Sequence, residues 1–133
     1  MKQLELPDHI MHAIAAEAAH ALPAEACGVL LGSLQDDVIH ISAHRPVAND
    51  AGDGAHEYAI PGDVVLGIQR AAEREGLDVV GFYHSHPAGP AGPSARDLAT
   101  AWPGYVYVIA DARTGGVTAW QLREDRHAFE PAD

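Results

Sequence analysis

Apolar residues recur every three or four positions in two stretches of the chain, residues 8–22 and 61–75. This spacing places them along one side of a helix, so it predicts two amphipathic helices over these ranges. Asp8 is expected to cap the first helix and Pro23 to stop it. Gly76 is well placed to end the second helix, since glycine readily adopts the left-handed conformation found after many helices.

Shorter apolar runs, bounded by Gly, Pro, Asn and Asp, predict strands. The predicted strands are residues 27–32, 38–43, 57–60, 79–84, 105–110 and 116–122. An exposed loop is expected over residues 45–56, and the charged tail after residue 123 is expected to fray. Ser94 is expected to cap a short third helix that carries Asp97 at its third position. This order of elements predicts a mixed β-sheet flanked by helices, in the α/β or α+β class, and one domain over residues 1–133.

Composition narrows the function classes. The formal net charge is −11 and Lys2 is the only lysine, which argues against binding the phosphates of a nucleic acid or an anionic membrane surface. The single cysteine, Cys27, excludes an internal disulfide and fits a reducing compartment. No signal-peptide pattern and no run of 18 apolar residues is present, so we expect a cytoplasmic protein.

Candidate chemistry is concentrated between residues 84 and 97. Alternate side chains of a strand point the same way, so His84 and His86 can direct their rings at one point, and Asp97 can add a third ligand from the following turn. Two nitrogens and one carboxylate form a typical catalytic zinc site, with the fourth position left to water. Ser94 lies three residues before Asp97, where its hydroxyl could stabilise an oxyanion. Glu25 is the best-placed general base, although spacing alone does not show that it reaches the metal.

The run His84-Ser85-His86-Pro87, followed by Ser94 and Asp97, resembles the signature of the JAMM (MPN+) metalloproteases. Residues 23–32 are similar to the upstream element of that family, which contains its catalytic glutamate. The resemblance implies a JAMM/MPN fold, which is cytidine deaminase-like, and one Zn²⁺ per chain. It implies that His84, His86 and Asp97 bind zinc, that Glu25 deprotonates the water in the fourth position, and that Ser94 stabilises the tetrahedral intermediate.

The same resemblance implies hydrolysis of the amide bond after the C-terminal glycine of a ubiquitin-like protein. The chain resembles the short, stand-alone prokaryotic members, whose expected substrates are β-grasp sulfur-carrier proteins. The loop over residues 49–56 and Tyr58 are expected to hold the substrate tail. Two alternatives remain, namely a binding or scaffold module without activity and a zinc hydrolase acting on another substrate class. The sequence leaves the oligomeric state open, including a homodimer.

Overall fold

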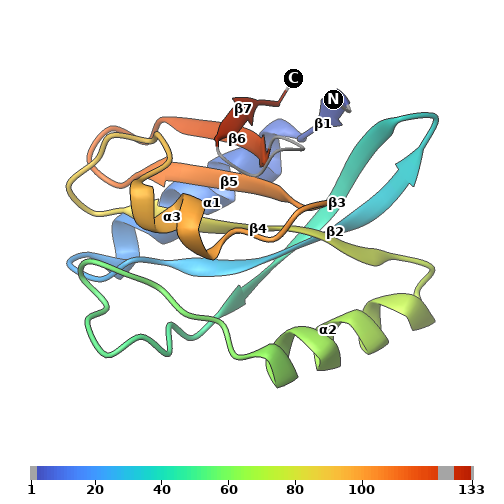
Figure 1. Ribbon diagram of the computed structural model, residues 1–133, viewed down its shortest axis with the longest axis horizontal. Coiled ribbons are helices and arrows are strands. Elements are labelled where there is room, and N and C mark those ends of the chain that lie inside the picture. The colour runs from blue at the N-terminus through green and yellow to red at the C-terminus, as the bar shows by residue number, and fades with distance from the viewer. Residues whose placement is uncertain (1–2, 123–127, 133) are drawn as a thin grey trace.

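A computed structural model describes residues 3–122 and 128–132, which form one curled, mixed sheet with three helices (Figure 1). The strand order is β1-β3-β2-β4-β5-β6-β7, with β1 parallel to β3, β4 parallel to β5, and the other pairs antiparallel. The elements are β1 (Gln3–Glu5), α1 (Asp8–Ala21), β2 (Cys27–Gln35), β3 (Val38–Val47), α2 (Gly62–Arg74), β4 (Asp78–His86), α3 (Ala95–Thr100), β5 (Val106–Asp111), β6 (Val117–Leu122) and β7 (Phe129–Pro131). The predicted fold class is confirmed.

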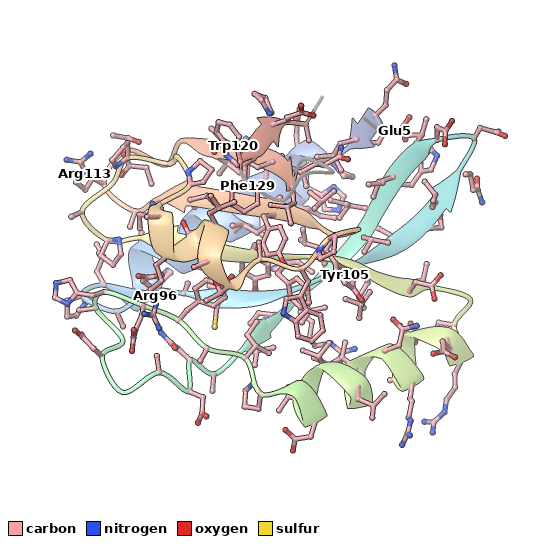
Figure 2. The ribbon with its side chains drawn as sticks, in the orientation of Figure 1. Glu5, Arg96, Tyr105, Arg113, Trp120 and Phe129 are labelled. Atoms are coloured by element: carbon pink, nitrogen blue, oxygen red, sulfur yellow. The ribbon has the colours of Figure 1, made fainter. Side chains whose placement is uncertain are left out.

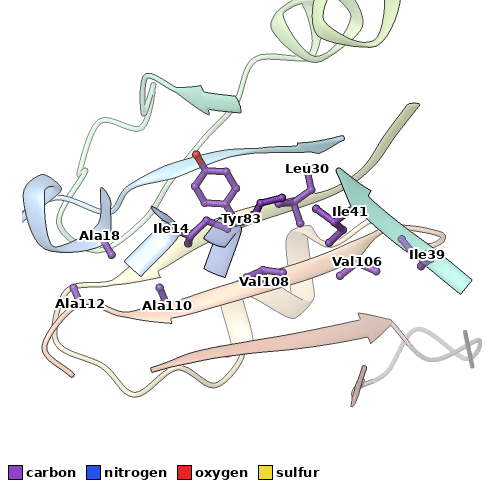
Figure 3. Close-up of a cluster of buried hydrophobic side chains, with 11 residues drawn as sticks. Ile14, Ala18, Leu30, Ile39, Ile41, Tyr83, Val106, Val108, Ala110 and Ala112 are labelled. Carbon is purple, nitrogen blue, oxygen red and sulfur yellow. The ribbon is translucent and has the colours of Figure 1, made fainter. Parts of the chain in front are cut away.

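Helices α1 and α2 cover opposite faces of the central strands, and β2 shows how the sequence achieves this. Leu30 packs with Ile14 of α1 and Tyr83 of β4 on one face (Figure 3). Its neighbours Val29 and Leu31 point the other way and pack with α2. A strand covered on both faces needs apolar residues at consecutive positions, which explains the unbroken run in β2. None of the described helices has the length and apolar character needed to cross a membrane.

The three predicted helices are confirmed, with one correction at an N-terminus. Asp8 is the first helical residue of α1, and the capping position is Pro7, without a side-chain cap. A carboxylate in the first turn still interacts favourably with the positive end of the helix dipole. Gly76, two residues beyond α2, has a φ of 74° and ends that helix as predicted.

The strands differ more from their predicted bounds. β3 runs to Val47 because its last residues pair with β2, so the loop expected from residue 45 begins later. The strand predicted over 57–60 is wrong. The backbone N–H of Ala59 donates to the Asn49 side chain and its carbonyl accepts from Asp50, so these groups bond within the loop.

Two short strands, β1 and β7, are not predicted by the apolar pattern, because three residues are too few to show a period. Part of the tail expected to fray, residues 123–127, lies outside the described residues. After it, β7 pairs antiparallel with β6 at the edge of the sheet.

Candidate metal centre

The end of β4 and the start of α3 bring three ligand-type side chains together. His84 and His86 lie two residues apart on β4, and their Nε2 atoms are 3.2 Å apart. The Asp97 carboxylate on α3 places Oδ1 3.1 Å from Nε2 of His84 and Oδ2 3.1 Å from Nε2 of His86. These are the three candidate ligands predicted from the sequence, and they form a compact triangle of donors.

The size of this triangle can be compared with the size that zinc requires. Zinc–nitrogen and zinc–oxygen bonds of about 2.0–2.1 Å at tetrahedral angles separate neighbouring ligand atoms by about 3.3 Å. The observed separations of 3.1 and 3.2 Å, in which Oδ1 of Asp97 faces His84 and Oδ2 faces His86, are close to that value. The donor set therefore fits a zinc ion, with one tetrahedral position left for water or substrate.

The two imidazole rings are fixed in different ways. Nδ1 of His86 lies 2.8 Å from the carbonyl oxygen of Pro90, which can only accept, so Nδ1 carries the proton and Nε2 keeps its lone pair for a metal. The ring of His84 stacks on Tyr58, with centroids 4.3 Å apart and an angle of 18°. Nδ1 of His84 is buried and has no hydrogen-bond partner among the described residues, so this stacking contact orients its ring.

Asp97 is positioned by the start of α3. The Ser94 hydroxyl accepts the backbone N–H of Asp97 at 3.0 Å, and the Ser94 N–H donates to Oδ2 of Asp97 at 2.9 Å. This reciprocal pair is a capping box, as the sequence position of Ser94 predicts. The capping bond uses one lone pair of the hydroxyl, so its O–H can still donate to another group.

Burial and mutual contacts set the charges of the candidate ligands. Burial lowers the pKa of His84 below its ordinary value, although the contact with Asp97 opposes this shift. Burial alone would raise the pKa of Asp97, but its contacts with His84 and His86 hold it well below the usual range. The contact with Asp97 raises the pKa of His86. A neutral His84 and an ionised Asp97 are the forms that bind a metal.

Glu25 lies just before β2, and it lines a cavity beside the ligand triangle. This cavity of about 230 Å³ is also lined by His86, Ser94 and Asp97. Burial raises the pKa of Glu25 to about 7, with His86 lowering it and Asp97 raising it further. A carboxyl group with such a pKa can take up and release a proton near neutral pH, as a general base must.

Ser85 is a buried polar residue whose role the sequence reasoning missed. Its hydroxyl accepts the N–H of Ala26 at 2.8 Å, and its own N–H donates to the carbonyl of Ala26 at 3.0 Å. Ser85 therefore ties the segment that carries Glu25 to the strand that carries both histidines. The available signal was its position between His84 and His86, which directs it away from the metal side of β4.

A second hollow of about 550 Å³ adjoins the first cavity. Its walls include Phe82, Tyr105, Tyr107 and the exposed Trp102, while Tyr58, Arg96 and Thr100 line both hollows. Figure 2 shows Arg96 on α3, on the side of the loop that precedes α2. Its guanidinium lies 2.7 Å from the carboxylate of Glu57 in that loop, so an ion pair bridges the rim of the site.

Comparisons of the sequence and of the structure with known proteins agree on one family. Residues 7–123 match the model of a family described as prokaryotic homologs of the JAB domain. The chain is 42% identical to the desampylase of Haloferax volcanii over 109 residues, covering 81% of this chain and 76% of that protein. It is 48% identical over 60 residues to a probable TtuB-protein conjugate cleaving protease of Thermus thermophilus, covering 45% of this chain and 39% of that protein. The solution structure of protein DSY2949 from Desulfitobacterium hafniense superimposes with a TM-score of 0.84 at 26% identity, covering 100% of this chain and 90% of that one.

Proposed function

The chain belongs to the family of prokaryotic homologues of the JAB domain, and we propose that it hydrolyses the amide bond after the C-terminal glycine of a ubiquitin-like or sulfur-carrier protein. It is a zinc-dependent hydrolase of the JAMM peptidase type. The proposal for the substrate is supported by the relatives, one a desampylase and one a probable protease that cleaves protein conjugates. We further propose that residues 1–133 form one such domain.

The observation that carries the proposed site is the donor triangle of His84, His86 and Asp97 beside the buried carboxyl of Glu25. A complete ligand set, with a proton acceptor lining the cavity beside it, argues against a module that binds without catalysis. In this proposal the three donors hold zinc, which supplies Lewis-acid chemistry that polarises a carbonyl oxygen and makes water acidic near neutral pH.

The remaining steps belong to side chains of the chain itself. The Glu25 carboxylate accepts the proton of the attacking water and then delivers it to the nitrogen of the leaving amine. Its pKa of about 7 suits both directions of transfer. The free O–H of Ser94 donates to the oxyanion that forms at the substrate carbonyl. Asp97 keeps that hydroxyl in place, because its backbone N–H holds the Ser94 oxygen.

The larger hollow is the proposed docking place for the substrate. Its aromatic walls give an apolar surface for the folded part of a ubiquitin-like protein. An extended tail would pass Tyr58, Arg96 and Thr100, which line both hollows, before it reaches the donor triangle. Glycine residues suit such a passage because they carry no side chain. The net charge of −11 disfavours nucleic-acid and membrane partners. A cytoplasmic location stays a prediction, and the oligomeric state, including a homodimer, stays open.

A cleavage assay tests the proposal. The substrate is a β-grasp carrier protein extended beyond its terminal Gly-Gly, either by a peptide or by a lysine-linked protein, and the products are identified by mass spectrometry. Wild type is compared with Glu25→Gln, each with its zinc content confirmed. We expect cleavage after the last glycine by wild type only. An inactive wild type with full zinc, or a fully active Glu25→Gln, would refute the assignment.

A further inference from the structure

The loop between β3 and α2 reaches back to the segment that carries Glu25. In Figure 1 this loop lies beside the start of β2, on the same side of the sheet as α3. The backbone N–H of Glu25 donates to the carbonyl of Gly54 at 2.6 Å. The carbonyl of Glu25 accepts from Nδ2 of Asn49 at 3.3 Å. Both backbone polar groups of the general base are therefore held by this loop.

Asn49 is the residue that organises the loop. Besides the bond to Glu25, its Nδ2 donates to the carbonyl of Glu57 at 3.0 Å. Its Oδ1 accepts the backbone N–H groups of Ala51 at 3.0 Å and Ala59 at 3.1 Å. These four bonds use both amide hydrogens and both lone pairs of the side chain. No carboxylate can replace it, because two of the bonds require a donor.

Ser85 of β4 holds the next residue, Ala26, by bonding to both its backbone N–H and its carbonyl. The Glu25–Ala26 segment is thus fixed between β4 and the loop. Loss of the Asn49 bonds would free the side of this segment that belongs to Glu25.

We propose that Asn49 is a positioning residue for catalysis, which fixes the backbone of Glu25 so that its carboxylate is held at the distance needed for proton transfer. This inference rests on the proposed function, because it assigns Asn49 to the general base of that reaction. Misplacement of a reacting group by about 1 Å costs roughly 100-fold in rate, so kcat is the parameter expected to respond.

Two substitutions distinguish the donor and acceptor roles of the Asn49 side-chain amide. Asn49→Asp keeps the acceptor oxygen for Ala51 and Ala59 but removes the donors to Glu25 and Glu57. Asn49→Ala removes all four bonds without adding a charge. Zinc-loaded wild type and variants are compared for kcat, KM and zinc content on the substrate of the assay above. Ile39→Val, which deletes one methyl group from the buried core, is the control for a mild loss of global stability.

We expect kcat to fall about 100-fold in both Asn49 variants, with KM within about twofold of wild type, full zinc content, and Ile39→Val at wild-type kcat. Wild-type kcat in Asn49→Ala would overturn the proposal. If kcat fell in Asn49→Asp only, the fall would be due to the added negative charge and not to the lost hydrogen bonds. A rise in KM at unchanged kcat would also overturn it, because the loop would then serve substrate binding. Loss of zinc from both variants would show a structural role at the metal centre and would equally overturn it.

A second readout does not depend on activity. Asn49 is the only asparagine in the sequence, so selective ¹⁵N labelling of asparagine side chains gives one NH₂ pair. We expect both hydrogens to exchange slowly with water, since both are bonded. Rapid exchange of both hydrogens would refute the geometry. If instead the pair is protected while zinc-loaded wild type cleaves no carrier protein, the proposed function fails and the placement of Asn49 stands.

Discussion

Ser85 offers the sharpest test of how the site is held together. The residue is 1% exposed, and its hydroxyl is the acceptor for the backbone N–H of Ala26 at 2.8 Å. In Ser85→Ala that buried N–H loses its partner, and a buried unsatisfied group of this kind costs about 1–3 kcal/mol. At about 2.1 cal/mol/K per residue, the unfolding entropy of 133 residues is about 0.28 kcal/mol/K, so the melting temperature should fall by about 4–11 °C.

The measurement is thermal unfolding followed by circular dichroism and calorimetry. A chelator is present, because bound metal would otherwise add its own stabilisation by mass action. Ser42→Ala provides the matched control, since it makes the same change at an exposed position of β3 and should stay within about 0.5 kcal/mol of wild type. Equal melting temperatures for the two variants would refute the reasoning, because the Ala26 N–H would then be satisfied without Ser85.

Three further outcomes are expected. Zinc affinity, measured by competition with a fluorescent chelator, should fall as the pH drops through the histidine range, because only neutral imidazole binds; full retention at pH 4 would contradict ligation by His84 and His86. Cys27, whose pKa burial raises to about 12, should react with a thiol reagent at pH 8 far more slowly in the folded than in the urea-unfolded protein, and equal rates would contradict its burial. Gly28→Ala should lower stability by about 1–3 kcal/mol in chemical denaturation, since an added Cβ would overlap the Tyr83 ring; an unchanged midpoint would show that this ring can move freely.

The sequence predicts best those features that depend on local spacing. The helical period of residues 8–22 yields α1 almost to the residue, and the His-x-His spacing correctly brings two rings to one point on β4. Ser94 and Asp97 likewise lie within one turn, so their capping relation follows from their separation alone.

Features that depend on distant partners are not predictable in the same way. The apolar run over 57–60 reads as a strand, yet Asn49 takes one of its backbone groups and keeps the segment in the loop. The contact between Ala26 and Ser85 joins residues 59 positions apart. Periodicity contains no information about such side-chain-to-backbone bonds. For the same reason spacing offered Glu25 as a candidate base but could not place it in a cavity with His86 and Asp97, and only the resemblance to a known family implied that it reaches the metal.

The short helix α3 has a consequence for the metal-free protein. Six residues are too few to form a helix on their own in water, so α3 depends on its capping box and its tertiary contacts. Oδ2 of Asp97 takes part in that capping box and also lies 3.1 Å from Nε2 of His86. An ion held by this carboxylate therefore also shifts the local unfolding equilibrium of α3 toward the folded side. Because Arg96 and Thr100 lie on the same helix, loss of the ion would loosen one wall of the proposed substrate passage as well as remove the Lewis acid.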